Sequence, residues 1–443
     1  MTFRQYLLKL HGRCNLSCTY CYVYEAADHS WRTKPRRMEL ATVHRVAERI
    51  AAYRREASAP GAGAGAGAGA SAGAGAAAPI AVTLHGGEPL LVGSRHLDET
   101  LTVLRDALDG TGDVAYAVQT NGVLLRDDPE LLRVLRRHRV RIGVSVDGTA
   151  ADHDRYRRFA DGRGSHAAVA GALGILGTEE HRDLFGGVLC TVDPATDPVA
   201  TYEALLAFAP PRMDLLLPHG TWGNPPPGLA GRQPPDRPPV PRPPVPRPPV
   251  SGPPVSGPPV PGPHAPGGAE EPTPYADWLC AVFDRWYGAP RRETGIRLFE
   301  ELIVLLLGGR ASSEMVGTGP ADLVVVETDG SLELADSLKA AYDGAAYTGL
   351  SVFRDSFAEA ARHPAFRTPR PAALCRECPL WAVCGGGLYA HRHHPGADEP
   401  FDRPTVYCHD MVVLIEHIRR RLEADVAAFN ARRATHEQEV GAR

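Results

Sequence analysis

The feature that most constrains the fold is a regular alternation of short apolar runs with longer helical stretches over the first half of the chain. Runs rich in β-forming residues occur at 5–10, 80–84, 114–119, 140–146, 186–191 and 212–217. Stretches typical of helices fill the gaps at 38–57, 95–109, 129–138, 166–177 and 198–208. This alternation predicts parallel strands joined by crossover helices, and hence the α/β class. Six such units predict a partial (βα)6 TIM barrel with its active site at the carboxyl ends of the strands.

Two low-complexity segments divide the chain. Residues 58–79 are almost entirely Gly and Ala and predict a flexible surface insert. Residues 218–272 carry proline repeats, which favour an extended linker over a docking segment. This division places a core domain at 1–217 and a separate small domain at 273–443. The small domain is expected to hold helices at 275–287, 293–307 and 409–430 and a strand at 322–326.

The composition is that of an ordinary globular protein, with 43% hydrophobic and 23% charged residues. The formal net charge of −4 gives no argument for a nucleic-acid partner or an anionic membrane. No apolar run approaches the roughly 20 residues that a membrane helix needs, and the N-terminus lacks the pattern of a secretory signal. We therefore expect a cytoplasmic protein with no nucleic-acid and no membrane partner.

Nine cysteines in a reducing compartment are not expected to form disulfides, and seven of them fall into two groups. The first group, Cys14, Cys18 and Cys21, directly follows the first predicted strand. Three thiolates are one short of closing a 4Fe-4S cluster, so one iron would stay open for a substrate-like ligand. A zinc site or a fully ligated cluster normally draws four ligands, and no fourth ligand is obvious nearby. The spacing favours an iron–sulfur cluster with an open iron.

This CxxxCxxC loop resembles the hallmark of the radical S-adenosylmethionine (SAM) superfamily. In that family the open iron binds the amino and carboxylate groups of SAM. The reduced cluster cleaves SAM to methionine and a 5′-deoxyadenosyl radical, which abstracts a substrate hydrogen. Tyr20 stands where the family places an aromatic residue beside the adenine. The resemblance implies a 4Fe-4S cluster on the three cysteines, with SAM as its partner in the reaction.

The segment after the second predicted strand also fits this resemblance. Gly86, Gly87 and Glu88 match the family's GGE motif, which binds the SAM amino group. Glycine lets the backbone approach a ligand, and a carboxylate can pair with an ammonium group. Alone, such a triplet is usually a turn; behind a CxxxCxxC loop and a strand it indicates a SAM site.

Polar residues follow the next two predicted strands. Asn121 and Ser145 are candidates for contacts to the ribose or carboxylate of SAM. Arg157 is a candidate clamp for the carboxylate. The alternative for all three is an ordinary loop-capping role, which the sequence leaves open.

The second group of cysteines lies near the C-terminus, at Cys375, Cys378, Cys384 and Cys408. Four thiolates can close an iron–sulfur cluster or a zinc site, and a CxxC pair with two distant cysteines also occurs in zinc ribbons. The order resembles the SPASM domain of peptide-modifying radical SAM enzymes, such as the anaerobic sulfatase maturases. That resemblance implies one auxiliary 4Fe-4S cluster held by all four cysteines.

The chain departs from the SPASM pattern at two positions that would ligate a further auxiliary cluster. Leu388 stands where the fourth signature cysteine belongs, and Ala335 where the upstream GxxxxC cysteine belongs. Their joint absence predicts that this cluster is lost. Asp336 occupies the place of the family's catalytic acid/base aspartate, with an ordinary loop residue as the alternative.

Other residues with metal-binding chemistry predict no further site. His391, His393 and His394 favour a solvated loop over a metal site. Cys190 and Cys280 stand apart from the other cysteines and are expected to be small core residues.

Apart from the low-complexity segments, the chain is most similar to the FxSxx-COOH-associated (FxsB-type) radical SAM/SPASM maturases, through the stretches CYVYE, LHGGEPL and ETDGSLELADSLK. This resemblance implies hydrogen abstraction from a side chain of a ribosomal precursor peptide, followed by an intrapeptide C–C crosslink of the cyclophane type. The alternatives are cyclopropane formation or another oxidation of a peptide, formylglycine formation as in sulfatase maturases, and a non-catalytic zinc-bearing scaffold. An electron donor such as flavodoxin or ferredoxin completes the expected partners.

Overall fold

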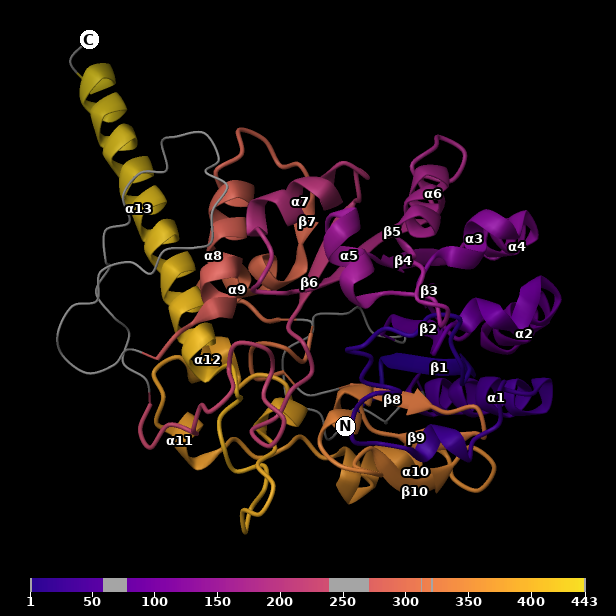
Figure 1. The fold of residues 1–443 in the computed structure, drawn as a ribbon. Helices are drawn as coiled ribbons and strands as arrows, with labels where there is room; N and C mark the ends of the chain where they lie inside the picture. The colour runs from indigo at the N-terminus through magenta and orange to yellow at the C-terminus, as the bar shows by residue number, and fades with distance from the viewer. Residues whose placement is uncertain (1, 59–77, 239–270, 312, 320–321, 442–443) are drawn as a thin grey trace.

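The computed structural model describes residues 2–58, 78–238, 271–311, 313–319 and 322–441, with side chains up to residue 433. Most of the Gly/Ala insert predicted at 58–79 lies outside the described residues, as do residues 239–270 of the proline-rich segment. Within the described part, one large sheet organises the chain (Figure 1).

The strand order of this sheet is β10-β9-β8-β1-β2-β3-β4-β5-β6-β7. Its centre consists of β1 (Gln5–His11), β2 (Ile80–Gly86), β3 (Val114–Thr120), β4 (Arg141–Ser145), β5 (Phe185–Thr191) and β6 (Arg212–Leu216). Each of these strands pairs in parallel with the next one along the chain. The predicted α/β class and the six predicted parallel strands are confirmed.

Strands from the C-terminal part of the chain extend both edges of the sheet. On one edge β7 (Gly295–Ile296) pairs in parallel with β6. On the other, β8 (Leu323–Val326) pairs in parallel with β1, followed by antiparallel β9 (Ser331–Glu333) and β10 (Tyr347–Ser351). The sheet thus crosses the division between the two domains expected from the sequence, because β8 takes up the backbone groups on the open edge of β1.

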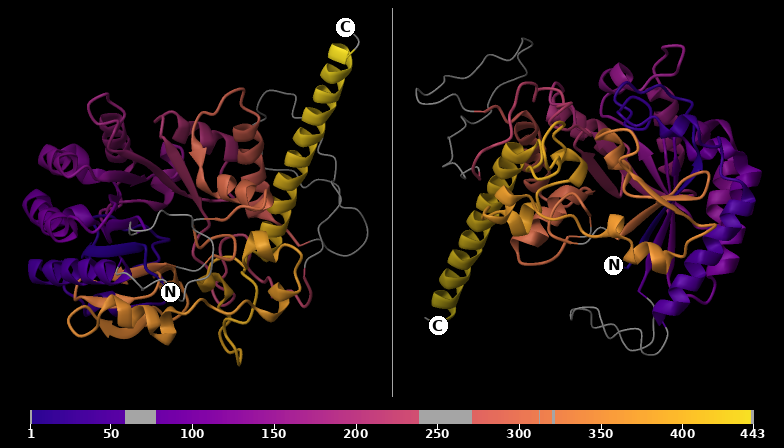
Figure 2. Two further views of the ribbon diagram at one scale, coloured as in Figure 1. Left: turned by 180° about the vertical axis from the view of Figure 1, so that it is seen from behind. Right: turned by 90° about the horizontal axis from the view of Figure 1, so that it is seen from below.

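Helices connect the parallel strands and cover one side of the sheet, while the C-terminal segment lies across the other side (Figure 2). The crossover helices are α1 (Leu40–Ser58), α2 (Gly93–Leu108), α3 (Val123–Asp127), α4 (Pro129–Arg137), α5 (Ala150–Tyr156), α6 (His166–Leu176) and α7 (Pro198–Leu206). Further helices are α8 (Pro274–Tyr287), α9 (Arg297–Leu306), α10 (Phe357–Arg362), α11 (Ala373–Arg376), α12 (Trp381–Cys384) and α13 (Cys408–Gly441). Short 3-10 turns occur at η1 (Ser30–Arg32), η2 (Pro89–Val92), η3 (Asp336–Ala340), η4 (Pro364–Phe366) and η5 (Tyr389–Arg392). Every helix that the sequence predicts is present.

Two of the crossover helices begin at an Asp-Pro pair. Asp128 accepts a hydrogen bond from a backbone amide of α4 at 3.0 Å, with Pro129 at the first helical position. Asp197 does the same for α7 at 2.7 Å, ahead of Pro198. The aspartate satisfies an amide that has no partner within the helix, and proline has no amide to leave unpaired. These pairs set where α4 and α7 begin.

The core lies between the sheet and its helices. Side chains in β2 alternate between buried and partly exposed, so that Ile80, Val82 and Leu84 face inward. Leu8 and Leu10 of β1 join the same buried cluster. Each fully buried aliphatic side chain stabilises the fold by about 1.5–3 kcal/mol. This core holds the strand ends rigidly in register.

The first part of the predicted linker, residues 218–238, is packed rather than extended. Trp222 is buried, and its indole nitrogen donates to the Pro404 carbonyl at 2.8 Å. The Arg232 guanidinium forms a buried ion pair with Asp410 at 2.8 Å. Proline content predicts an open chain here, but an indole and a buried ion pair supply the contacts that hold this stretch against the C-terminal segment.

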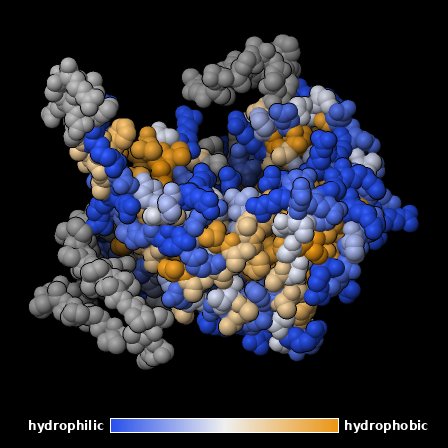
Figure 3. Space-filling model, turned by 90° about the horizontal axis from the view of Figure 1, so that it is seen from above, coloured by the Kyte–Doolittle hydropathy of each residue, from blue (hydrophilic) through white to orange (hydrophobic). Residues whose placement is uncertain are grey.

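No helix in the described part of the chain is both long enough and apolar enough to cross a membrane. The longest helix, α13, projects from the rest of the molecule (Figure 1), and its residues 423–433 are all exposed. The face drawn in Figure 3 intersperses hydrophilic with hydrophobic residues.

Candidate active site and cysteine centres

The functional segments expected in the first half of the chain all follow carboxyl ends of parallel strands. The first cysteine loop follows β1, the Gly-Gly-Glu segment closes β2, Asn121 follows β3 and Ser145 is the last residue of β4. Parallel strands end at the same edge of a sheet. These segments therefore meet on one face of the protein.

The loop that carries Cys14, Cys18 and Cys21 is held by backbone hydrogen bonds. The amide of Ser17 donates to the Arg158 carbonyl at 2.7 Å, and the amide of Cys21 donates to the Cys18 carbonyl at 3.1 Å. Burial raises the pKa of all three thiols, and for Cys14, where Glu88 and the other two cysteines add to the effect of burial, the pKa rises to about 12. A metal bound here would replace the protons of these thiols, because cysteine ligates as the thiolate.

Two glycines let the end of β2 lie against this loop. A side chain on Gly87 would place its Cβ 1.8 Å from the Tyr24 hydroxyl and 2.6 Å from the carbonyl carbon of Arg13. At Gly86, where φ is +152°, a Cβ would lie 2.2 Å from the His11 carbonyl oxygen. Only glycine fits at both positions. The bare backbone of the strand end therefore lies directly beside the cysteine loop.

The Glu88 carboxylate is fully buried and bonds to its own chain. It accepts hydrogen bonds from the Leu90 amide at 3.0 Å, the Thr120 hydroxyl at 2.7 Å and the Asn121 amide at 2.8 Å. Burial raises the pKa of this carboxyl, while the hydrogen bonds oppose the shift. Since a carboxylate offers about four acceptor positions, one remains for a ligand. The side chain also ties the end of β2 to the end of β3.

Asn121 reaches from the end of β3 to the cysteine loop. Its side-chain nitrogen donates to the Asn15 side-chain oxygen at 2.8 Å and lies 3.6 Å from the Cys14 sulfur. Ser145 lies one strand further along and accepts a hydrogen bond from the Gln119 side chain at 3.0 Å. The structure thus places Asn121 in contact with the cysteine loop and Ser145 at the end of β4, which pairs with β3.

Tyr20, Asp147 and Arg157 form a buried group beside the loop. The Tyr20 hydroxyl donates to Asp147 and accepts from Arg157 at 2.8 Å. Burial raises the pKa of Asp147, and Arg157 opposes that shift. Arg157 is 8% exposed, and its Nε has no hydrogen-bond partner among the described residues. An unpaired donor on a buried guanidinium can take an anionic ligand such as a carboxylate.

A cavity opens beside this group, at the carboxyl ends of β4 and β5. Its lining includes Tyr20, Asp147, Tyr156, Cys190, Thr191 and Tyr275. Mostly apolar and aromatic walls with a few polar groups are typical of a small-ligand pocket. The expectation that Cys190 and Cys280 are core residues is confirmed, since both are buried.

The four later cysteines face a second cavity. Its walls are Cys375, Cys378, Cys384 and Cys408 together with apolar side chains that include Leu374, Leu380, Trp381 and Val412. Burial raises the pKa of Cys384 to about 11. Burial, together with the three neighbouring thiols, also raises the pKa of Cys408. Four thiols around one apolar cavity suit a fully ligated cluster or a zinc ion.

A buried arginine holds the turn that follows Cys384. Gly385, Gly386 and Gly387 have φ values of +64°, +77° and +68°, a backbone conformation that favours glycine. The Arg392 guanidinium donates to the carbonyls of all three glycines, at 2.7, 3.1 and 3.2 Å. The arginine and the glycines together fix the chain that leaves Cys384.

The two positions that lack a signature cysteine lie in segments that pack against each other. Ala335 directly precedes η3, and Leu388 directly precedes η5. Leu338 of η3 and Ala390 of η5 form a small apolar cluster with Ala346. This direct packing supports the prediction that no cluster is held between these segments.

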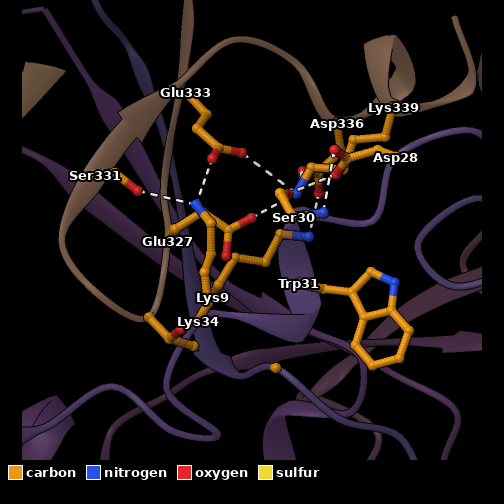
Figure 4. Close-up of polar contacts among 12 residues, drawn as sticks. Lys9, Asp28, Ser30, Trp31, Lys34, Glu327, Ser331, Glu333, Asp336 and Lys339 are labelled. Atoms are coloured by element: carbon orange, nitrogen blue, oxygen red, sulfur yellow. Dashed lines mark hydrogen bonds and ion pairs between the residues drawn. The ribbon is translucent and has the colours of Figure 1, made fainter. Parts of the chain in front are cut away.

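Asp336 belongs to an ion-pair network of three lysines and three carboxylates (Figure 4). Its members are Lys9, Lys34, Lys339, Glu327, Glu333 and Asp336. Lys339 bonds to Glu327 at 2.5 Å and lies 3.3 Å from Glu333. Oxygens of the three carboxylates lie within 4.8 Å of one another, a spacing that a metal ion could use. The three ammonium groups already balance the three negative charges, so an ion-pair network is the better description. No local sequence pattern marks these lysines, because only the fold brings them close to the carboxylates.

Asp336 lies on the side of this network that faces β1 and β2. It pairs with Lys9 of β1, lies 3.5 Å from Lys339, and lies 4.0 Å from the ring of His85 at the end of β2. Burial raises the pKa of this carboxyl, but the two lysines outweigh burial and hold the pKa below its usual range. Asp336 is therefore ionised at neutral pH.

The prediction of a solvated loop is wrong for His391 and His393, which are buried, whereas His394 is partly exposed. His391 is 2% exposed and His393 is 7% exposed. The ring of His391 lies 3.2 Å, nitrogen to nitrogen, from that of His219. The amide of Trp222 donates to the His393 carbonyl at 2.9 Å. These contacts come from the first part of the predicted linker, which the sequence alone did not place beside the histidines.

No protein-family model matches this chain. It is similar to the cysteine-type anaerobic sulfatase-maturating enzyme of Clostridium novyi, with 26% identity over 165 residues, which are 37% of this chain and 38% of that protein. It is also 30% identical to the serine-type enzyme of Klebsiella aerogenes over 164 residues, 37% of this chain and 34% of that protein. The matched part thus spans little more than a third of these relatives. The predicted resemblance to the anaerobic sulfatase maturases is confirmed over that part.

Solved structures extend the likeness over the whole fold. Native anSMEcpe with bound AdoMet matches with a TM-score of 0.68 and 20% identity, over 96% of this chain and 99% of that chain. Streptococcus suis SuiB bound to precursor peptide SuiA matches with a TM-score of 0.52 and 10% identity, over 92% and 76% respectively. At these identities the shared property is the fold.

Proposed function

We propose that this protein is a radical SAM enzyme that acts on a peptide. One arrangement carries the proposal: a three-cysteine loop lies against bare strand-end backbone at Gly87, with Asn121 in contact with Cys14. Proteins of similar fold support it, since their structures hold AdoMet, a Cp18Cys peptide or a precursor peptide.

Both cysteine groups fit iron–sulfur clusters. The proposed ligands of the radical SAM 4Fe-4S cluster are Cys14, Cys18 and Cys21, and those of one auxiliary 4Fe-4S cluster are Cys375, Cys378, Cys384 and Cys408. The thiols of the second group line one cavity, and the three of the first group stand in one short loop, so each group can surround a cluster once the metal has replaced the thiol protons. When loaded and reduced, the first cluster supplies the electron that cleaves SAM to methionine and the 5′-deoxyadenosyl radical.

The groups nearest the first loop would bind the amino-acid end of SAM. The bare backbone at Gly86 and Gly87 and the remaining acceptor position of Glu88 would take the ammonium group. The unpaired Nε of Arg157 would take the carboxylate. Opposite charges on the two sides of the site would orient the ligand.

The nucleoside end would lie toward Tyr20. Hydrogen bonds to Asp147 and Arg157 fix the orientation of that ring, so it can face the adenine without moving. Asn121 and Ser145 are the proposed contacts to the ribose or the carboxylate, Asn121 being the one that touches the cysteine loop.

Asp336 is the proposed acceptor of the proton that leaves the modified peptide. Its ionised state suits that role, because only a carboxylate can take a proton. The ion pair with Lys9 weakens it as a base.

The substrate we favour is a ribosomally made precursor peptide, and the product is an intrapeptide C–C crosslink of the cyclophane type. Fold similarity to a protein bound to a precursor peptide supports the substrate class. Cyclopropane formation or another peptide oxidation would begin with the same hydrogen abstraction. A flavodoxin or ferredoxin in the cytoplasm would supply electrons.

Formylglycine formation is the second candidate, because the curated relatives are sulfatase-maturating enzymes. Mass spectrometry separates the two outcomes. A crosslink removes two hydrogens from the peptide, whereas formylglycine made from cysteine also exchanges sulfur for oxygen.

The test of the central claim is anaerobic. Wild type and a Cys14→Ala/Cys18→Ala/Cys21→Ala variant are reconstituted, iron and sulfide are counted, and 5′-deoxyadenosine is measured after SAM and dithionite are added. We expect about eight irons in the wild type, about four in the variant, and SAM cleavage in the wild type alone. Zinc in place of iron, or no 5′-deoxyadenosine from the loaded wild type, would overturn the proposed radical SAM function and favour a zinc-bearing scaffold.

A further inference from the structure

Four aromatic side chains form a continuous row that connects the segments carrying the two cysteine groups. The ring centroids of Tyr22 and His219 are 4.7 Å apart, those of His219 and His391 are 5.4 Å apart, and those of His391 and Tyr407 are 5.2 Å apart. The histidine nitrogens approach each other to 3.2 Å. We call these four residues the aromatic row.

Each end of the aromatic row is next in sequence to a proposed cluster ligand. Tyr22 directly follows Cys21, and Tyr407 directly precedes Cys408. The two histidines between them come from the loop after β6 and from η5. Segments from four parts of the chain therefore meet in one row, which the proposed SAM site does not use.

Backbone contacts hold the row in place. The Tyr407 hydroxyl donates to the Pro218 carbonyl at 2.5 Å, next to His219. The Val406 amide donates to the His391 carbonyl at 2.9 Å. The spacing of the rings is thus set by hydrogen bonds between the segments that carry them.

Both histidines are neutral. Burial lowers the pKa of His219 to about 4 and that of His391 well below its usual value. A neutral pair joins one N–H donor to one acceptor nitrogen, so the 3.2 Å contact is a hydrogen bond without net charge. No group in the row has to gain or lose a proton when an electron passes.

We propose that the aromatic row is the electron-transfer path between the two iron–sulfur clusters, which rests on the function proposed above. Electron tunnelling slows steeply with the through-space gap to be crossed, and side chains in contact shorten those gaps without being oxidised or reduced themselves. The row also passes beside the position of the missing cluster, since the His391 amide donates to the Leu388 carbonyl at 3.0 Å. With no ligand at that position, the row supplies the connection between the two remaining centres.

Each transfer moves one electron. With both clusters bound, the auxiliary cluster would be oxidised by one electron and the radical SAM cluster reduced by one, while no bond in the aromatic row breaks and no proton moves. Cleavage of SAM consumes one electron, and the peptide radical releases one electron when it loses its proton. Return of that electron along the row leaves both clusters unchanged after a turnover, so the external flavodoxin or ferredoxin is needed to start the cycle.

The test compares variants that remove or keep the rings. His219→Leu/His391→Leu interrupts the row, and His219→Phe/His391→Phe keeps two π systems. His96→Leu is the matched control, because His96 is a buried histidine of α2 whose ring bonds to the Met38 carbonyl at 2.9 Å. Iron content and dithionite-driven formation of 5′-deoxyadenosine should equal those of the wild type in all three.

The measurement is electron redistribution between the clusters. Reconstituted protein receives less than one electron per molecule from a photochemical flash, and freeze-quench EPR follows the two cluster signals. We expect the leucine pair to slow redistribution by at least an order of magnitude, the phenylalanine pair to keep most of the rate, and the control to match the wild type.

The proposed path would be overturned if electrons redistributed at the same rate in the wild type and in a fully loaded His219→Leu/His391→Leu variant. It would also be overturned if the His96→Leu control slowed redistribution as much as the leucine pair does. Zinc at the second centre would also overturn it, because zinc has no redox chemistry. A doubly loaded wild type that forms no 5′-deoxyadenosine would instead overturn the proposed function. If the leucine pair loses a cluster, His219→Leu alone replaces it, with the same expected slowing.

Discussion

The two cysteine centres present the same type of ligand in opposite surroundings. At the first centre, the Asn121 side chain touches Cys14, and Arg157 keeps a buried donor without a partner in the described chain. At the second centre, apolar side chains surround the thiols, and the nearby Arg392 donates its hydrogen bonds to glycine carbonyls. The first centre offers polar groups to a ligand, and the second encloses its thiols.

This difference agrees with the number of thiols at each centre. Three thiols leave an iron open, and spare polar groups around them can orient what binds there. Four thiols complete a cluster, and an apolar wall keeps water away from it. Ligand number and surroundings therefore agree with the roles proposed above, a ligand-binding cluster at the first centre and an electron-transfer cluster at the second.

The largest effect is expected at the first centre, from Gly87→Ala. The added Cβ would lie 2.6 Å from the Arg13 carbonyl carbon, a backbone atom that no side-chain rotation can clear, so the strand end must move away from the cysteine loop. Because such a displacement misplaces the bound ligand, we expect 5′-deoxyadenosine formation to fall at least about a hundredfold. Gly174→Ala in α6, where an added Cβ meets open space, is the control. Full activity in Gly87→Ala would contradict the close approach of strand and loop.

The next effect is expected at the second centre, from Arg392→Met. The substitution leaves buried carbonyls without their donor and should lower the free energy of unfolding by about 3 kcal/mol. About four irons should be lost, while dithionite-driven SAM cleavage persists. Arg403→Met, at an exposed arginine, should change neither. If SAM cleavage disappears together with the iron, the two centres are not independent.

A smaller effect is expected from Asp336→Asn in the network next to the first centre. Burial raises the pKa of Asp336, but Lys9 and Lys339 hold it below the unfolded value of about 3.9. The carboxylate therefore contributes its full stability above that pH and loses it as the pH falls through the folded-state pKa. Urea unfolding should show the wild type more stable by about 2 kcal/mol between about pH 5 and pH 8, with a narrowing gap below about pH 4. A gap that widens in acid would contradict the lowered pKa.

The smallest effect is expected from Ala335→Cys/Leu388→Cys, which restores both missing signature cysteines. Leu338 and Ala390 close the space between the two segments, and two thiols alone cannot hold a cluster. We expect the iron content of the reconstituted variant to equal that of the wild type. A gain of about four irons would show that the space is open and that only the ligands are missing.

The order of strands and helices could be predicted from the sequence, because hydrophobic periodicity and helix caps are local signals. The run expected at 80–84 is β2, Ile80–Gly86, and the helix expected at 129–138 is α4, Pro129–Arg137. The two cysteine groups could be predicted for the same reason, because the spacing of the cysteines along the chain indicates how many thiols each group contains. The packing of residues 218–238 could not be predicted, because proline repeats further along dominate that stretch and the partners of Trp222 and Arg232 lie near the C-terminus.

By itself, the sequence determined the elements of the fold and the kind of ligand at each centre, since both follow from side-chain chemistry over short spans. Only the tertiary structure decided which distant groups meet. Pairing of β8 with β1 brings Asp336 to Lys9, and packing of η5 against the loop after β6 joins His219 to His391 across 172 positions. The physical reason is that these contacts depend on strand order and on the docking of whole segments, which no local pattern encodes.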